Sequence, residues 1–384
     1  MITEKLYDMD SHLSDFEATV LKCERNGGNY AIVLDRTAFF PEGGGQRADT
    51  GVIGRAAVTD VRINGGEIVH YADSPVEIGS VCLCSVDREL RFRRMQNHSG
   101  EHLVSGIVHN IYGFDTVGFH MGDDVTVDFS GELTDEDVAK VERLANEAVY
   151  KNVKITAEYP DEETLKNLDY RSKLELTENV RIVTIEGYDR CACCAPHVSC
   201  TGEIGFIKII EHSRHRGGTR IRMLSGLDAY NDSVIKYDNL RKIAVRLCAK
   251  QNEAAQVFEG LFNENARLRQ ELARAKKEIV RLKNDSLSGD KNVPVFENEL
   301  SVPELRELAL DSAKTREGCC AFFSGGDGRG YTFAVASRTV PLGEVIKRMR
   351  SELNARGGGS DELIQGSANT TEAAIRDFFS EVKE

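Results

Sequence analysis

The sequence lacks any run of apolar residues long enough to cross a membrane, since a spanning helix needs about 20 of them. Its first residues, Met1 to Asp8, also lack the basic-then-apolar layout of a secretory signal peptide. Apolar residues make up 41% and charged residues 29% of the chain, which argues against disorder and against a membrane protein. We therefore expect a cytoplasmic protein without a membrane partner. Its 384 residues are enough for two or three domains.

Positive charge is scarce, because 49 Lys and Arg stand against 62 Asp and Glu and give a formal net charge of −13. Such a balance normally counts against a nucleic-acid partner. The charge is uneven, however, since residues 203–283 hold 17 Lys and Arg against 10 Asp and Glu. Because this middle segment is basic, the acidic charge of the whole chain does not exclude binding to nucleic acid.

Cysteine, by contrast, is abundant, and four of the ten cysteines fall within ten residues. Without a secretory signal, such a cluster indicates metal or thiol chemistry before disulfides. The cluster consists of Cys191, Cys193, Cys194 and Cys200.

Several patterns along the chain predict separate structural regions. Short apolar runs between turn residues predict a small β-rich domain of hairpins at the N-terminus. Mixed α and β patterns follow, including a helix from about Asn97 to Tyr112 whose apolar side chains recur at helical spacing. We expect an α+β, multidomain fold divided into residues 1–90, 91–228, 229–290 and 291–384.

The third region has the pattern of a long helix. Residues 232–283 contain no proline, and their later part fits a heptad register with mainly apolar a and d positions. This pattern predicts a coiled coil or a long helical hairpin, and one amphipathic helix packed on its own domain is the alternative. The a positions are Phe258, Asn265, Leu272 and Ile279, and the d positions are Leu261, Leu268, Ala275 and Leu282.

Two pairs of residues have the spacing of metal ligands. His98 and His102 lie one helical turn apart, so both imidazoles can face one ion, and Cys193 and His197 repeat this four-residue spacing. Three imidazoles and a thiolate suit tetrahedral zinc, which can fix a substrate or activate water. Exposed helix histidines and an unrelated buried cysteine cluster would give the same pattern. The other cysteines that could replace Cys193 as a ligand are Cys191, Cys194 and Cys200.

A glycine run near the N-terminus is a second unusual element. Gly43, Gly44 and Gly45 precede Gln46, and Thr37 opens the same segment. Consecutive glycines let the backbone approach a ligand closely and expose its N–H groups, although a tight hairpin loop has the same composition.

Two further segments are less specific. The basic stretch with Arg216, Arg220 and Arg222 could contact a phosphate backbone, although a solvated basic strand is the ordinary interpretation. The glycine-rich segment 357–366 has a composition that reveals no role by itself.

Taken together, these motifs resemble those of the freestanding alanyl-tRNA editing proteins of the long type. Those proteins are similar to the editing and C-terminal parts of alanyl-tRNA synthetase. The resemblance implies a small β-barrel-like domain, an α/β editing domain with zinc, a helical or coiled-coil segment and a C-terminal α/β domain. The segments that carry it follow the family's order along nearly the whole chain and are residues 37–46, 95–103, 193–205 and 357–366.

The resemblance also implies an activity, which is hydrolysis of the ester that joins serine or glycine to the tRNA for alanine. A pocket for alanine cannot strongly exclude these amino acids, because one small group is worth only about 1–3 kcal/mol of binding energy. Gln46 and the backbone of Gly43, Gly44 and Gly45 would lie near the aminoacylated 3′ end, and Thr37 would sense the serine hydroxyl. The implied zinc ligands are His98, His102, Cys193 and His197.

Three features qualify the resemblance. No segment resembles a class II aminoacylation core and the chain begins directly with the β-rich region, so we expect editing in trans without charging of tRNA. Pro196 removes a backbone donor from the turn before His197. Glu101 stands where the family often has a neutral residue and could add a carboxylate near the metal.

Two alternative functions fit parts of the pattern. His98, Glu101 and His102 match the HxxEH pattern of inverted zincins, in which Glu101 would be the general base. That class expects a downstream carboxylate as third ligand, whereas a Cys/His pair is better placed here. The other alternative is a structural-zinc adaptor that binds tRNA or assembles complexes, since four protein ligands are typical of structural zinc. The heptads make a homodimer through the helical segment or the C-terminal domain plausible.

Overall fold

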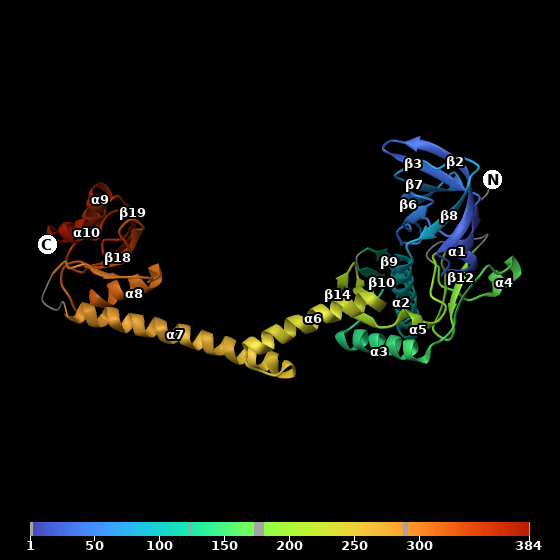
Figure 1. The fold of residues 1–384 in the computed structure, drawn as a ribbon. Coiled ribbons are helices and arrows are strands. Elements are labelled where there is room, and N and C mark those ends of the chain that lie inside the picture. Colours follow the sequence, from blue (N-terminus) through green and yellow to red (C-terminus); the bar gives the residue numbers. More distant parts are fainter. Residues whose placement is uncertain (1–2, 123, 173–179, 287–290, 384) are drawn as a thin grey trace. The chain divides into compact units, whose positions relative to one another are not determined.

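The computed structural model describes residues 3–122, 124–172, 180–286 and 291–383. The chain divides into two compact units, Met1–Lys242 and Ile243–Glu384, and both contain helices and strands (Figure 1). The expected mixed, multidomain organisation is therefore confirmed. The division into four regions stays a prediction, because the boundary between the two units falls inside the segment 229–290. Among the described residues, no helix is long and apolar enough to span a membrane.

Six strands near the N-terminus form a closed antiparallel barrel: β2 (Asp15–Asn26), β3 (Asn29–Leu34), β5 (Gly51–Ile53), β6 (Ala56–Asn64), β7 (Glu67–Ala72) and β8 (Val81–Val86). They pair in the order β2-β3-β7-β6-β5-β8, and β8 pairs with β2. Alternate side chains of β2 enter the barrel core, namely Phe16, Ala18 and Val20. Beside the barrel, β1 (Glu4–Lys5) pairs in parallel with β4 (Arg36–Thr37), and α1 (Leu6–Met9) follows β1.

Helix α2 (Arg88–Tyr112) follows the barrel and carries the two spaced histidines. It begins after Asp87, whose side chain caps the first turn, and ends at Gly113, which has a left-handed φ of 70°. The predicted start at about Asn97 was too late. In the first turns the buried face includes the charged Arg91, which forms an ion pair with Asp49 of the barrel region. An apolar pattern therefore does not mark this part of the helix in the sequence.

Between α2 and Ser225, the described part of the first unit contains two sheets and three further helices. The core joins α2 and α3 to both sheets, through residues such as Val104, Val141, Val127 and Val183. One sheet has the order β14-β15-β10-β9 and the other β11-β12-β13. These elements are β9 (Thr116–Met121), β10 (Val125–Phe129), α3 (Asp135–Lys151), β11 (Ile155–Glu158), α4 (Glu162–Asn167), β12 (Ile182–Ile185), β13 (Asp189–Ala192), α5 (Thr201–Ile204), β14 (Ile207–His215) and β15 (Gly218–Ser225).

The proline-free segment forms two helices, α6 (Gly226–Arg246) and α7 (Ala254–Ser286). The apolar heptad side chains of α7 remain exposed, and Leu268 and Leu272 are 49% and 57% accessible. Helix α7 instead packs on the C-terminal domain through Val280, which is fully buried. The predicted helical character is therefore confirmed, whereas a coiled-coil partner for this stripe stays a prediction.

The C-terminal domain is a five-stranded sheet of order β16-β17-β18-β20-β19. Its two faces have separate cores, because Phe322 packs with α8 whereas Phe323 packs with α9 and α10. The elements are β16 (Val295–Glu297), α8 (Val302–Ser312), β17 (Cys320–Gly326), β18 (Gly330–Ala336), α9 (Leu342–Glu352), β19 (Ala355–Gly359), β20 (Leu363–Ala368) and α10 (Glu372–Ser380).

The second glycine run, 357–359, lies within strand β19 and not in a loop. A Cβ atom on Gly357 would lie 2.2 Å from the carbonyl oxygen of Gln365, and one on Gly359 would lie 2.0 Å from that of Leu363. These glycines are therefore required by the close approach of β19 to β20.

Candidate functional site

Four side chains with the spacing of metal ligands meet in the first unit. His98 and His102 project from the same face of α2, while Cys193 and His197 come from the turn after β13. Their ligand atoms all lie within 4.8 Å of one another, and the three histidines are buried. The structure thus brings the two predicted pairs into one cluster.

Each imidazole is held by a second residue that faces its Nδ1 atom. Nδ1 of His98 lies 2.9 Å from Oε1 of Gln46, and Nδ1 of His102 lies 3.1 Å from a carboxylate oxygen of Asp189. Because these oxygens accept hydrogen bonds, each Nδ1 carries a proton, and Nε2 is the nitrogen left to serve as a ligand. The third imidazole, His197, has its Nδ1 atom 3.0 Å from Oγ of Ser99.

The free nitrogens face the cysteine sulfur. Sγ of Cys193 lies 3.6 Å from Nε2 of His98 and 3.4 Å from Nε2 of His197. Burial lowers the pKa of His197 to about 3, so this imidazole is neutral. Burial disfavours the Cys193 thiolate, but the surrounding histidines outweigh it and lower the pKa of the thiol well below its usual value. Burial lowers the pKa of His102, but its hydrogen bond to Asp189 and the nearby cysteines outweigh burial and raise this pKa well above its usual value. Zinc binds neutral imidazoles and a thiolate, so metal binding would release a proton from His102.

A second group of donors, His102, Asp189 and Cys191, shares one histidine with the cluster. The carboxylate of Asp189 is already engaged, because Arg171 donates to both of its oxygens at 2.7 and 2.9 Å. Asp189 therefore orients His102, and the four-residue cluster is the better metal site.

The turn formed by the glycine run places Gln46 beside this cluster. Gly43 and Gln46 exchange backbone hydrogen bonds of 2.9 and 3.1 Å across a tight turn, in which Gly44 and Gly45 have φ values of 58° and 82°. The buried Gln46 contacts His98 through Oε1, and its Nε2 has no hydrogen-bond partner among the described residues. A buried amide donor beside a metal cluster is thus available to a ligand oxygen.

The other two candidate residues lie in different surroundings. The hydroxyl of Thr37 faces Nε2 of His70 at 2.8 Å, a contact within the barrel. Glu101 is buried beside the cluster, where one carboxylate oxygen accepts a hydrogen bond from Ser105 and the other lies 4.0 Å from Nε2 of His102. The structure therefore brings Glu101 to the metal ligands, whereas the contacts of Thr37 are with barrel residues.

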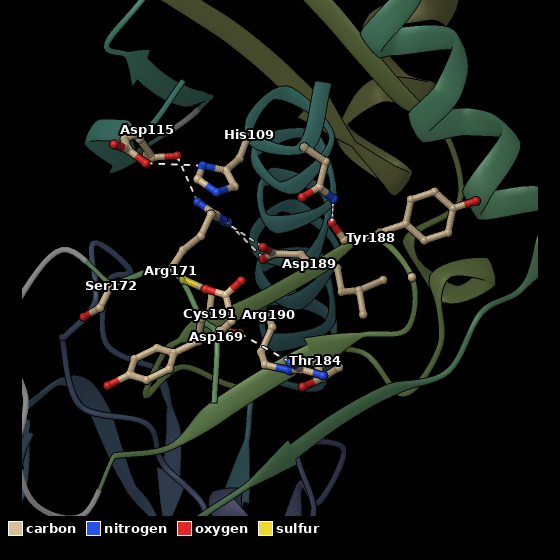
Figure 2. Close-up of a pocket in the computed structure, with 15 residues that line it drawn as sticks. His109, Asp115, Asp169, Arg171, Ser172, Thr184, Tyr188, Asp189, Arg190 and Cys191 are labelled. Carbon is tan, nitrogen blue, oxygen red and sulfur yellow. Dashed lines mark hydrogen bonds and ion pairs between the residues drawn. The ribbon is translucent and has the colours of Figure 1, made fainter. Parts of the chain in front are cut away.

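A pocket of about 560 Å³ has Asp189 in its lining (Figure 2). Figure 2 shows Arg171 directed at Asp189, and Cys191 and Tyr188 also line the pocket. Because Asp189 contacts both Arg171 and His102, this pocket and the metal cluster share one hydrogen-bond network.

Comparisons with known protein families match segments that contain the cluster and the barrel. The family described as "Threonyl and Alanyl tRNA synthetase second additional domain" matches residues 180–222, which include Cys193 and His197. The family described as "tRNA synthetases class II (A)" matches residues 11–90, which fold as the barrel. This second match falls in the segment for which the sequence predicted only a small β-rich domain.

Several relatives align with nearly the whole chain. The "Alanyl-tRNA editing protein AlaX-L" of Pyrococcus horikoshii is 27% identical over 98% of this chain and 97% of that protein. The chain is a homologue of the alanyl-tRNA editing proteins. It is also 30% identical to the "Alanine--tRNA ligase" of Pyrococcus abyssi over 99% of this chain and 43% of the ligase. The ligase of Ignicoccus hospitalis is 29% identical over 93% of this chain, which spans only 40% of that enzyme. The chain thus covers about two fifths of the ligases it matches.

Two of the three arginines expected to contact tRNA form ion pairs with carboxylates. Arg220 forms a two-pronged ion pair with Asp128 at 2.6 and 2.8 Å. Arg222 pairs with Asp124 and with Glu211. Arg216 lies exposed in the turn between β14 and β15, and the paired Arg222 is also exposed. Their contact with RNA stays a prediction.

Sequence reasoning missed the residues that hold the ligands. Ser99 and Asp189 fix two imidazoles, and nothing in their local pattern distinguishes them from other polar residues. The buried Arg181 was also missed, although its guanidinium donates to the carbonyl oxygens of Cys193 and Ala195. An arginine ahead of a strand resembles a surface charge, so only the tertiary structure identifies it.

Proposed function

We propose that the protein is a zinc-dependent deacylase that hydrolyses seryl or glycyl esters of the tRNA for alanine. The observation that carries the proposal is the cluster of His98, His102, Cys193 and His197 beside the unpartnered amide of Gln46. The relation to an alanyl-tRNA editing protein supports the substrate class, and the metal is inferred from the three-nitrogen, one-sulfur donor set.

The reaction adds water across the ester that links the amino acid to the ribose. The bond from the acyl carbon to the ribose oxygen breaks, the water oxygen joins the acyl carbon, and a proton passes to the ribose oxygen. A zinc ion held by these residues supplies Lewis-acid polarisation or a more acidic water.

The protein's own residues orient the substrate. The Nε2 amide of Gln46 donates a hydrogen bond to an oxygen of the aminoacyl group, which satisfies this buried donor. Backbone atoms of Gly43 and Gly44 allow a close approach beside it. Thr37 is a weaker candidate for sensing serine, because its hydroxyl is engaged by His70.

Deacylation of seryl-, glycyl- and alanyl-tRNA for alanine tests the proposal. The double variant Cys193→Ala, His197→Ala should lose activity, and Cys200→Ala serves as a control because it removes a nearby thiol outside the cluster. Rapid loss of the seryl or glycyl ester with alanyl-tRNA spared is expected. No hydrolysis by folded, zinc-loaded protein would contradict deacylation and favour a structural-zinc adaptor. Peptidase activity abolished by a chelator would instead favour the HxxEH protease.

We further propose that the chain forms a homodimer through α7 and edits without charging tRNA. The exposed apolar heptads support the dimer, because a stripe of this length is seldom left in water. The 27% identity to an alanyl-tRNA editing protein over 98% of this chain supports editing without charging. Attempted charging of tRNA with alanine and ATP tests the second point.

A further inference from the structure

Glu101 is a buried acidic residue on the same face of α2 as the two candidate histidine ligands. His98, Glu101, His102 and Ser105 recur at helical spacing, so their side chains project together. Only 6% of the Glu101 side chain is exposed. A carboxylate is rarely buried to this extent unless another group compensates its charge. The burial of Glu101 therefore calls for a partner.

One oxygen of this carboxylate is fixed by a chain of hydrogen bonds. The hydroxyl of Ser105 donates to Oε1 of Glu101 at 2.7 Å, and the hydroxyl of Thr116 donates to Oγ of Ser105 at 3.0 Å. Arg171 in turn donates to Oγ1 of Thr116 at 3.2 Å. The protein itself thus sets the position of Glu101, without the help of a ligand.

The second oxygen, Oε2, has no comparable support. No residue that the structure describes donates a hydrogen bond to it, and none of the described lysines or arginines lies in ion-pair distance of Glu101. It lies 4.0 Å from Nε2 of His102, the nitrogen that faces the metal cluster. Arg171 does not neutralise Glu101 directly, because its guanidinium is paired with Asp189. A buried carboxylate oxygen therefore faces the cluster with an unfilled acceptor site.

We propose that Glu101 binds the α-ammonium group of the aminoacyl ester, an inference that rests on the proposed function. Gln46 lies beside His98 and Glu101 beside His102, and the centroids of these two imidazole rings are 5.4 Å apart. Two carbon atoms separate the ammonium nitrogen of an aminoacyl ester from its carbonyl oxygen, so one substrate can contact both residues. The ammonium group supplies the positive charge and the N–H donors that Oε2 of Glu101 lacks.

This contact makes the site selective for esters with a free amino group. An N-acylated ester, such as peptidyl-tRNA, has no ammonium group and leaves the buried carboxylate without a partner. Glu101 is thus a substrate-binding residue that spares N-acylated tRNA.

The test is binding of two non-hydrolysable amides to the zinc-loaded full chain, measured by calorimetry. 3′-Glycylamino-3′-deoxyadenosine carries the ammonium group, and the 3′-propionylamino compound has a methyl group in its place. We expect the unmodified protein to bind the glycyl compound about 10- to 100-fold more tightly, the range of a hydrogen bond to a charged group. Glu101→Gln keeps the side-chain length and an acceptor for Ser105, and it should reduce this ratio to about threefold or less. Glu89→Gln, the same change at an exposed position of α2, should leave the ratio unchanged.

Three outcomes would overturn the proposal. The first is a ratio that survives in Glu101→Gln, and the second is an unmodified protein that does not distinguish the two compounds, which decides the matter even if the variant fails to fold. The third is equal weakening of both compounds, since a residue that only supports His102 affects them alike. Hydrolysis of seryl- and glycyl-tRNA, measured in parallel, separates the two proposals. Hydrolysis without discrimination between the compounds refutes the role of Glu101 alone, whereas no hydrolysis and no binding of either compound refutes the proposed function as well.

Discussion

Arg181 lies behind the turn that carries two of the proposed metal ligands, and only 3% of its side chain is exposed. Its Nη1 atom donates to the carbonyl oxygen of Ala195 at 2.8 Å and to that of Cys193 at 3.2 Å. The counter-charge is Asp8, 3.6 Å from Nε and contributed by α1 beside the barrel. A buried guanidinium thus fixes the ligand turn and ties it to the N-terminal region.

We expect Arg181→Met to lower zinc affinity by about 10- to 100-fold, as loss of outer-shell partners of metal ligands typically does. The methionine fills the space but cannot donate to the two carbonyl groups, so the turn loses its support. Chelator competition, and the visible spectrum of the cobalt-substituted protein, measure this change. Arg190→Met, which alters an exposed arginine in neighbouring strand β13, should leave both readings unchanged. Equal zinc affinity in the two variants would refute the role of Arg181.

His70 provides a second prediction at this scale, because burial lowers its pKa to about 4. The neutral ring accepts from Thr37 at Nε2 and donates to the Ile32 carbonyl oxygen from Nδ1 at 3.1 Å. The unfolded chain binds a proton near pH 6.5, whereas the folded barrel does not. Stability of the first unit should therefore fall as pH drops from 6.5 to 4, by about 3 kcal/mol in total.

Urea unfolding of the first unit, followed by circular dichroism at several pH values, measures this dependence. His70→Gln should flatten the pH dependence even if it lowers stability at all pH values, and His120→Gln, an exposed control, should not. An equally steep dependence in His70→Gln would assign the effect to other groups.

At the scale of elements, the features that could be predicted from the sequence are those set by the spacing of residues along one helix or strand. The spacing of His98 and His102 predicted a shared helix face, and this face does meet Cys193 and His197. The start of α2 could not be predicted, because Arg91 is buried only through Asp49 of a distant segment. The glycines of β19 likewise depend on β20, since no local pattern reveals how closely two strands approach.

Helix α7 allows a test of the proposed dimer. Leu268→Glu with Leu272→Glu places charges in the middle of the exposed stripe, and we expect a dimer to dissociate because buried like charges are strongly unfavourable. Sedimentation equilibrium measures the mass. Arg269→Glu with Arg274→Glu, on exposed positions outside the a and d register, is the control. A monomeric unmodified protein would remove the dimer proposal, and an unaffected dimer would move its interface away from α7.

For the whole molecule, the two compact units should respond differently to metal. All four ligands belong to the first unit, and they come from α2 and from the turn after β13, which are far apart in sequence. Binding to the folded state alone stabilises it by about 4 kcal/mol when free metal exceeds its dissociation constant 1,000-fold. The second unit has its own cores and depends on none of these ligands.

Removal of metal should therefore increase hydrogen exchange in α2 and in β12 to β14, while exchange in α8 to α10 stays the same. Peptide-level mass spectrometry with and without a chelator measures both units in one sample. The Cys193→Ala, His197→Ala variant should show high exchange in the first unit whether or not zinc is added, because half of its ligands are missing. Equal changes in both units would mean that metal stabilises the entire chain, and the expectation that the second unit does not depend on the metal ligands would then be wrong. No change in either unit, with zinc shown to bind, would mean that the four ligands are held in place by Gln46, Ser99, Asp189 and Arg181 before the metal arrives.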